Sequence, residues 1–322
     1  MHKLVFIAAA GLGLCAACVG TALAIGGDEF DFGSGEGFSL FDGRPRCQAV
    51  AGATNGTREM AWDGSDQAGL NFLGQASYRP GAGDRLVASG DPQVLAHLRI
   101  RKGTVELDCR GWRDRTREIA VTLPGRRFDK FSVSGGRLTI DGLEQHSVAI
   151  AIAGSGKVQA SGKLEEEIRA SIAGSGDMNL GDITARRGRM EIAGSGTMRA
   201  RNMRLADEFK VSIAGSGRAE MEQLTTRDAR AEIAGSGTII AESGTVDALK
   251  ISIAGSGRGD FGRLASRTAK VEIGGHGDVD IAPTDLADVD IGGSGDVTLH
   301  SNPRELKTDI GGSGKVHRLA GG

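Results

Sequence analysis

Six basic residues recur every 20 or 21 positions in the second half of the chain. They are Arg169, Arg189, Lys210, Arg230, Lys250 and Lys270. Evenly spaced cations on one surface can bind a polyanion, such as an acidic polysaccharide or lipopolysaccharide, because their charges add along the partner. Alternatively, Glu191, Glu232 and Glu272, each close to this set in the chain, neutralise the cations as exposed ion pairs. The spacing is compatible with both interpretations.

A second set of charged residues alternates in sign with the same spacing. Its members are Glu166, Arg186, Asp207, Arg227, Asp247, Arg267, Asp285 and Arg304. If successive segments of about 20 residues stack on one another, opposite charges lie next to each other along the stack. We then expect a ladder of ion pairs. Its main effect is on register, because a slip by one copy would bring like charges together.

Catalytic chemistry has less support in the sequence. Each of the segments of about 20 residues that carry these charges also contains a Gly-x-Gly sequence. Its central residue is Ser in every segment but one, where it is His276. A nucleophile needs one activated hydroxyl beside a base, so we interpret the repeated serines as corner hydroxyls that bond to the backbone. The copies are nearly constant in length and leave no long loop for a cleft. We therefore expect no enzyme, no cofactor and no metal ion, with a polysaccharide lyase or hydrolase as the alternative.

The first residues are typical of an export signal. Lys3 precedes an apolar run, and Ala22-Leu23-Ala24 supplies a small-x-small cleavage pattern. We expect a signal peptide over residues 1–24, with export to the periplasm or the cell surface. A membrane anchor and a lipoprotein attached through Cys18 are the alternatives.

Two cysteines remain after that cleavage, Cys47 and Cys109. An exported protein meets conditions that permit disulfides, so we predict a bond between them. No histidine lies near either cysteine in the sequence to complete a set of metal ligands.

A repeated pentapeptide, Ile-Ala-Gly-Ser-Gly or a close variant, indicates which secondary structure positions these residues. Its nine copies begin at Ile152, Ile172, Ile192, Ile213, Ile233, Ile253, Ile273, Ile291 and Ile310. A fixed period near 20 indicates a solenoid. Apolar residues two positions apart around each copy indicate short strands. We predict an all-β parallel β-helix, right-handed as parallel crossovers usually are.

One column suggests a unit of two coils. The residue four positions before each Ile alternates between large and small: Ile168, Gly188, Phe209, Ala229, Leu249 and Ala269. Such alternation would allow neighbouring layers to interdigitate.

The division of the mature chain follows its composition. We expect a flexible, Gly-rich leader over residues 25–56, divergent N-terminal coils and a cap over 57–131, and a regular solenoid over 132–322. A net charge of −2 gives no reason to expect a nucleic-acid partner.

The segment Arg85-Leu-Val-Ala-Ser-Gly-Asp-Pro, with Leu107 and Leu123-Pro124-Gly125 beyond it, is followed by the Ile-Ala-Gly-Ser-Gly coils. Together they resemble the putative autotransporter adhesin head (GIN) domain of bacterial envelope proteins. The resemblance implies an exported bacterial β-solenoid and carries no catalytic residues. No membrane β-barrel follows the last coil here, so a periplasmic location is expected as much as a surface one. We expect a structural or adhesin-like protein that presents a long face to envelope polysaccharide, lipopolysaccharide or another envelope protein.

Overall fold

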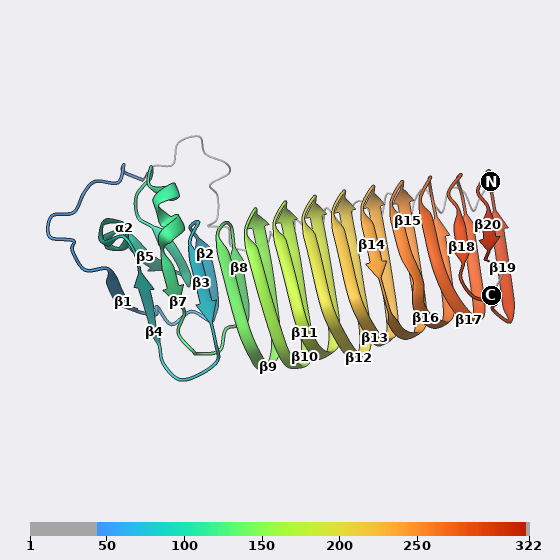
Figure 1. Ribbon diagram of the computed structural model, residues 1–322, viewed down its shortest axis with the longest axis horizontal. Coiled ribbons are helices and arrows are strands. Elements are labelled where there is room, and N and C mark those ends of the chain that lie inside the picture. The colour runs from blue at the N-terminus through green and yellow to red at the C-terminus, as the bar shows by residue number, and fades with distance from the viewer. Residues whose placement is uncertain (1–43, 320–322) are drawn as a thin grey trace.

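The computed structural model describes residues 44–319. The predicted signal peptide, Cys18 and residues 25–43 of the predicted leader lie outside this range. Coils of about 20 residues stack side by side into a long parallel β-solenoid, with a cap of mixed strands at one end (Figure 1). The prediction of an all-β parallel β-helix is confirmed. Within the described residues, no helix is both long and apolar enough to span a bilayer.

Within residues 44–319, the solenoid consists of thirteen strands. Their bounds are β8 Lys130–Val133, β9 Arg137–Gly154, β10 Lys157–Gly174, β11 Asp177–Gly194, β12 Thr197–Gly215, β13 Arg218–Gly235, β14 Thr238–Ala241, β15 Gly244–Gly255, β16 Arg258–Ile273, β17 Asp278–Ile291, β18 Val297–Leu299, β19 Glu305–Ile310 and β20 Val316–Arg318. Each pairs in parallel with the corresponding strand of the next coil, so that Ile152, Ile172 and Ile192 are aligned partners. These isoleucines are at most 2% exposed, and their outward neighbours are polar or small.

The Gly-Ser-Gly corners are shaped by close backbone approach. Gly174 has a φ of 130°, and a Cβ there would lie 2.6 Å from the carbonyl oxygen of Gly154 in the coil before. A Cβ on Gly176 would lie 2.5 Å from Cγ2 of Ile152. Side chains are therefore excluded at both positions, which explains why glycine flanks the corner serine in coil after coil.

The alternation of large and small residues lies inside the solenoid, in register. Gly188 pairs with Phe209, and Phe209 pairs with Ala229. Phe209 is 1% exposed, so its ring lies within the core, between coils that carry only hydrogen or methyl at this position. This arrangement fits the predicted two-coil unit.

The cap contains the remaining elements: β1 Thr57–Ala61, β2 Gln67–Asn71, β3 Gln75–Tyr78, β4 Arg85–Ser89, α2 Pro92–Ala96, β5 Leu98–Arg101, β6 Thr104–Leu107, the 3₁₀ helix η1 Arg113–Glu118 and β7 Ala120–Thr122. Strands β2 and β3 pair in parallel with β8 and β9, and on their other side with β6 and β7. Strands β6 and β7 therefore cover β2 and β3, and the order of the strands in the stack differs from their order in the sequence. Antiparallel pairing of β4 with β1 and β7 completes the cap.

An aromatic cluster packs beneath the cap. Trp62, Tyr78 and Phe131 surround Phe128, with ring centroids 5.2 to 5.6 Å from it. Phe128 and Phe131 are fully buried. Burial also raises the pKa of Tyr78 above its usual range, and its hydroxyl donates to the carbonyl oxygen of Arg126.

Candidate functional site

The six basic residues defined above form one axial column on the outside of the solenoid, which we call the basic column. Each is the aligned partner of the next, from Arg169 in β10 to Lys270 in β16. Their side chains point outward because the neighbouring positions carry the buried core residues. Coils lie about 4.8 Å apart, so the column presents closely spaced cations on a rigid sheet.

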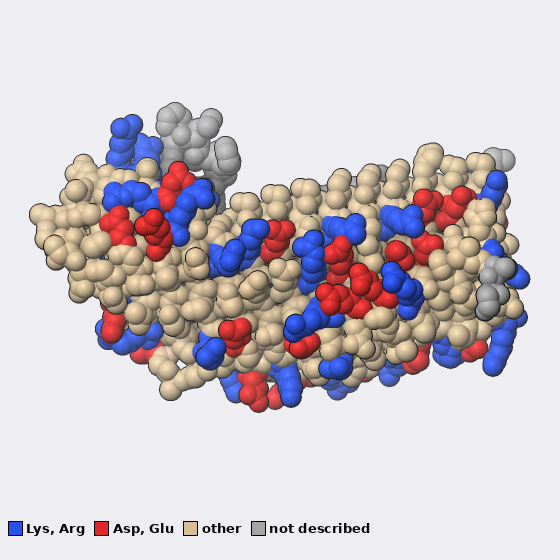
Figure 2. All heavy atoms as spheres, viewed as in Figure 1, with Lys and Arg blue, Asp and Glu red and all other residues tan. Residues whose placement is uncertain are grey.

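Each member of the basic column has a carboxylate partner within 4 Å. The closest pairs are Arg169–Glu167 at 3.0 Å, Arg189–Glu191 at 3.2 Å, Lys210–Glu232 at 2.9 Å, Arg230–Glu208 at 3.3 Å, Lys250–Glu272 at 3.7 Å and Lys270–Glu272 at 3.0 Å. The hydrogen bond to Glu272 raises the pKa of Lys270 above its usual range. The surface is thus of mixed charge, as the alternative interpretation expected. Figure 2 likewise shows blue and red side chains interspersed over the coils on the face in view.

The basic side chains nevertheless stay accessible. Lys210 is 28% exposed, and the other five are 41% to 59% exposed. Exposed ion pairs of this kind contribute about 0 to 1 kcal/mol each, so a competing anion can replace the intramolecular carboxylates.

The alternating ladder forms over part of its length. Arg186 lies 4.0 Å from Glu166 and 2.7 Å from Asp207, and Arg227 lies 3.1 Å from Asp207 on the other side. The hydrogen bond from Arg186 lowers the pKa of Asp207 below its usual range, and the same bond raises the pKa of Arg186. These four residues behave as one chain of charges through successive coils.

The ladder is interrupted in the next two coils. Within residues 44–319, neither Asp247 nor Arg267 has an ion pair, although their neighbours in the chain are aligned across β13, β15 and β16. Arg227 reaches Asp207 and Asp228 instead of Asp247. A register shift follows between β16 and β17, and the ladder resumes only at Asp285–Arg304, 3.4 Å apart. Backbone alignment therefore does not by itself bring these side chains together.

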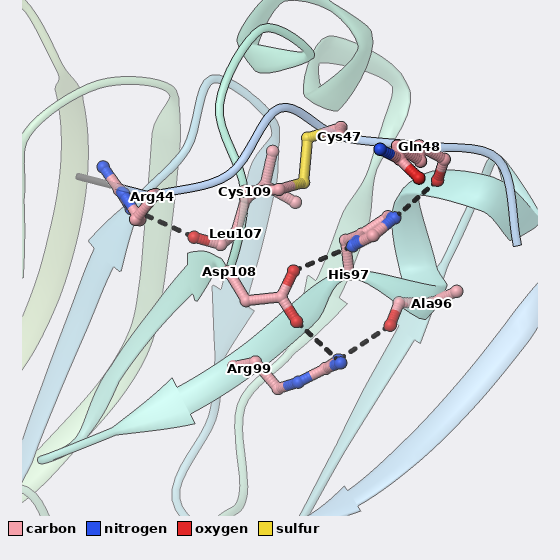
Figure 3. Close-up of a disulfide and its surroundings, with 9 residues drawn as sticks. All are labelled: Arg44, Cys47, Gln48, Ala96, His97, Arg99, Leu107, Asp108 and Cys109. Atoms are coloured by element: carbon pink, nitrogen blue, oxygen red, sulfur yellow. Dashed lines mark hydrogen bonds and ion pairs between the residues drawn. A yellow bond between two sulfur atoms is a disulfide. The ribbon is translucent and has the colours of Figure 1, made fainter. Parts of the chain in front are cut away.

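The predicted disulfide ties the start of the described chain to the cap. Cys47 and Cys109 are bonded, and the amide of Cys47 donates to the carbonyl oxygen of Arg110. Arg44 donates to the carbonyl oxygen of Leu107 at 3.0 Å (Figure 3). Residues 44–50, which the sequence placed in a flexible leader, are thus fastened along the end of β6.

A histidine does lie beside this disulfide, which sequence reasoning missed. The Nδ1 of His97 lies 2.8 Å from Oδ1 of Asp108, and its Nε2 lies 2.8 Å from the carbonyl oxygen of Gln48 (Figure 3). The antiparallel β5–β6 hairpin brings residue 97 opposite residue 108, so their separation in the sequence hid the contact. Ligand atoms of His97, Asp108 and Cys109 lie within 4.8 Å of one another, but the Cys109 sulfur is committed to the disulfide. The cluster therefore serves to hold the segment around Gln48.

The column of corner serines differs from expectation in one respect. The inter-coil hydrogen bonds at this corner come from the backbone, for example from the amide of Ser175 to the carbonyl oxygen of Gly154 at 2.9 Å. The serine side chains are exposed, and among the described residues their hydroxyls make no hydrogen bond. The interpretation that these hydroxyls bond to the backbone was therefore wrong, and backbone amides carry the ladder.

Two hollows lie where the cap meets the first coils. One, of about 440 Å³, is lined by residues of β2, β6 and β8, among them Lys130, and by Arg101 at the end of β5 and Lys102 in the turn that follows. The other, of about 560 Å³, is lined partly by Glu144, His146 and Glu165. It therefore holds two carboxyl groups, which is the arrangement that a glycosidase would need. The side chains of His146 and Glu165 are 72% and 80% exposed, however, so neither is desolvated as a glycosidase general acid is.

The fold and the surface together define a capped, parallel β-solenoid with outward-facing charged columns. The chain belongs to the family described as "putative auto-transporter adhesin, head GIN domain", whose model matches residues 86–205 and 200–303. The resemblance seen in the sequence is thereby confirmed, and the family description names an adhesin and no enzyme. No curated protein matches the chain.

Solved structures give a more distant likeness. A putative lipid binding protein from Parabacteroides distasonis is 21% identical, covers 82% of this chain and 96% of its own, and has a TM-score of 0.44. A putative adhesin from Bacteroides fragilis is 14% identical, with coverage of 85% and 99% and a TM-score of 0.35. One from Parabacteroides merdae is 15% identical, with coverage of 82% and 95% and a TM-score of 0.42.

Proposed function

We propose that this protein is a non-enzymatic, adhesin-like component of the bacterial envelope that presents its basic column to an anionic envelope polysaccharide such as lipopolysaccharide. The observation that carries the proposal is the in-register alignment of six accessible cations on one rigid face. The family's adhesin description supports the class of function. Export through a signal peptide over residues 1–24, to the periplasm or the cell surface, is part of the same proposal.

The carboxylates beside the column set how it would bind. A polyanion must replace partners such as Glu191, Glu232 and Glu272, and each replacement exchanges one weak, exposed ion pair for another. The gain per coil is small. A repeating polymer engages several coils at once, and each further contact is intramolecular, so modest contacts sum to useful avidity.

Retention on heparin or lipopolysaccharide beads at graded salt tests this proposal. Replacing Arg189, Arg230 and Lys270 together by Gln should release the protein at clearly lower salt. Replacing Glu191, Glu232 and Glu272 by Gln should have the opposite effect, because it removes the competing carboxylates.

The matched control neutralises three cations beyond the corner, Lys157, Arg199 and Arg258. Each is also ion-paired, with Asp177, Glu220 and Asp280 respectively. Unchanged retention of the basic-column variant, or an equal loss in the control, would show that the column does not bind the polymer.

A carbohydrate-active enzyme is the second candidate, favoured only by the hollow that contains Glu144 and Glu165. If this hollow cleaves polysaccharide, the purified protein will release reducing ends or unsaturated products from an envelope polysaccharide. Glu144→Gln and Glu165→Gln would each abolish that release. Absence of products from the wild-type protein would eliminate this candidate.

A further inference from the structure

The last coil of the solenoid exposes core positions that every earlier coil buries. Ile310 of β19 is 40% exposed, whereas the eight earlier isoleucines of the pentapeptide are at most 2% exposed. Leu306 of β19 and Val316 of β20 are also only partly buried. Their aligned partners in the coil before, Ala287 and Val297, are fully buried. Figure 1 shows β19 and β20 at the end opposite the cap. Within residues 44–319, β19 pairs only with β17 and β20 only with β18, so their outer edges have no partner strand.

The open edge of β19 lacks the usual obstacles to strand pairing. Such edges are commonly protected by a proline, a bulge or an inward-pointing charge. The six residues of β19 include no proline and pair with β17 without a register shift. Its inward positions carry Leu306, Thr308 and Ile310, which are aligned with fully buried residues of β17. A further strand can therefore continue the sheet.

The cap limits how a second copy of this chain can add to that edge. At the opposite end, β6 and β7 cover β2 and β3, so no open first coil is available to pair in parallel with β19. A head-to-tail filament of solenoids is thus blocked. Two last coils can still meet end to end. A two-fold axis perpendicular to the sheet then makes the two β19 strands antiparallel and keeps inward residues opposite inward residues.

Charge favours one register of this antiparallel pairing. With the axis at Thr308, Lys307 lies opposite Asp309 of the second copy, and the symmetry forms this pair twice. With the axis at Lys307, lysine would face lysine and Glu305 would face Asp309, which is unfavourable. The ion pair that Lys307 makes within its own chain, with Glu305 at 3.1 Å, is exposed and therefore weak.

Asp309 interacts within its own chain, and the register does not require it to be free. It is aligned with Asp290 of β17, so two like charges occupy the same position in neighbouring coils. A cation opposite Asp309 is favourable for that reason. One carboxylate can hold two cations, as Asp207 does with Arg186 and Arg227.

The same register matches the inward residues. Leu306 lies opposite Ile310 of the second copy, again twice, and each covers apolar surface that a single chain exposes. Thr308 lies opposite Thr308 of the second copy on the axis. Its aligned partner in the coil before is Val289, which is fully buried. A threonine at this one exposed end suits the pairing, because threonine pairs are favourable across antiparallel strands.

We propose that the last coil is a docking surface for a second copy of this chain, and that two solenoids join end to end through antiparallel β19 strands about a two-fold axis at Thr308. The joined rod carries a cap at each end. Lys307 is aligned, through Asp288, with Lys270 of the basic column, so the axis is perpendicular to the sheet that carries the column. Both basic columns therefore lie on the same side of the rod.

Sedimentation equilibrium of the purified protein tests the assembly. We expect the mass of two chains at high protein concentration and the mass of one chain on dilution. Lys307→Glu should weaken the association at least about tenfold, because the symmetry places like charges opposite each other twice. The matched control is Lys163→Glu, the same charge reversal at an exposed position of β10, and it should change nothing. A single-chain mass at hundreds of micromolar overturns the proposal.

Two further variants test the register. Thr308→Cys should form an intermolecular disulfide under mild oxidation, because directly opposite residues of antiparallel strands have Cα atoms about 4.5–5.5 Å apart, within disulfide reach. Thr245→Cys, exposed on β15, should not. Adding Asp309→Lys to Lys307→Glu restores opposite charges and should recover the association. A two-chain mass that ignores Lys307, or equal cross-linking of both cysteine variants, would show that the chains associate elsewhere.

The outcome can be told apart from that of the proposed function. A dimer that depends on Lys307, together with bead retention that ignores the basic column, would keep this interface and discard the column. A monomer whose retention depends on the basic column would keep the column and discard the interface.

Discussion

The cap and the regular coils solve the same packing problem in different ways. In the coils each strand pairs with the equivalent strand of the next repeat, the core is mainly aliphatic, and glycine corners let backbones approach closely. In the cap, a late segment folds over an earlier one, aromatic rings fill the core, and a disulfide holds the edge. A repeating stack has no closure of its own, so its end must be covered by a non-repeating structure. The comparison shows that the repeats determine how long the solenoid is, while the cap covers its exposed end.

The disulfide offers the largest test of this division. Cys47 and Cys109 are 62 residues apart, and a loop of that length predicts a stabilisation of about 4 kcal/mol. The double variant Cys47→Ala/Cys109→Ala should destabilise the cap and leave the coils folded. Both tryptophans, Trp62 and Trp112, lie in the cap, so their fluorescence reports its unfolding by denaturant, while far-UV circular dichroism reports the coils.

In the disulfide experiment, the fluorescence transition should shift to lower denaturant more than the dichroism transition. If the two signals shift together, the cap and coils unfold as one unit and the division is wrong. The oxidised wild type is the control.

A smaller effect is expected at the glycine corners. Gly174→Ala combines a positive φ with a Cβ 2.6 Å from a backbone oxygen, whereas Gly142→Ala at a φ of 70° meets nothing within 4 Å. We expect about 1 kcal/mol of destabilisation at Gly142 and at least about 1 kcal/mol more at Gly174. Thermal unfolding followed by circular dichroism measures both. Equal losses would mean that close packing of the corners does not define the coil.

The charge ladder should have the smallest effect. The pKa of Asp207 is lowered in the folded protein, chiefly by the hydrogen bond from Arg186, so its stabilising contribution is present above the ordinary aspartate pKa. That contribution is lost as the pH falls through the lowered pKa. Asp207→Asn should therefore lower the thermal midpoint slightly at neutral pH and low salt, and should differ less from wild type in acid.

The matched control for that variant is Asp247→Asn, because Asp247 has no ion pair within the described residues. It should change the midpoint less than Asp207→Asn does. A larger change at Asp247 would show that sign alternation, and not contact, determines the effect.

Much of the coil could be predicted from the sequence, because each position in the repeat has one physical role. The Ile spacing gave the register, and the corner glycines marked the bends. The ion pairs that the charged columns form were less predictable. Alignment brought Arg186 to Asp207, but Arg227 turned away from Asp247, since long side chains choose among several partners on an exposed face.

The cap was harder to predict for a topological reason. Divergent coils and a cap were expected over residues 57–131, but the order in which the strands stack could not be predicted, because β6 lies on β2 across an intervening segment. The hollow between β2, β6 and β8 arises only from that order. The contact of His97 with Asp108 comes instead from the antiparallel β5–β6 hairpin, whose pairing the sequence did not reveal. A non-repeating region offers no second copy from which alignment can be inferred.

Lysine acylation footprinting with mass spectrometry tests the central claim, that the basic column binds an anionic polysaccharide. Lys210, Lys250 and Lys270 belong to the column, while Lys157, paired with Asp177, lies beyond the corner and serves as the internal reference. The account predicts that lipopolysaccharide slows acylation of the three column lysines and leaves Lys157 unchanged. Equal protection of all four, or protection of Lys157 alone, would contradict it.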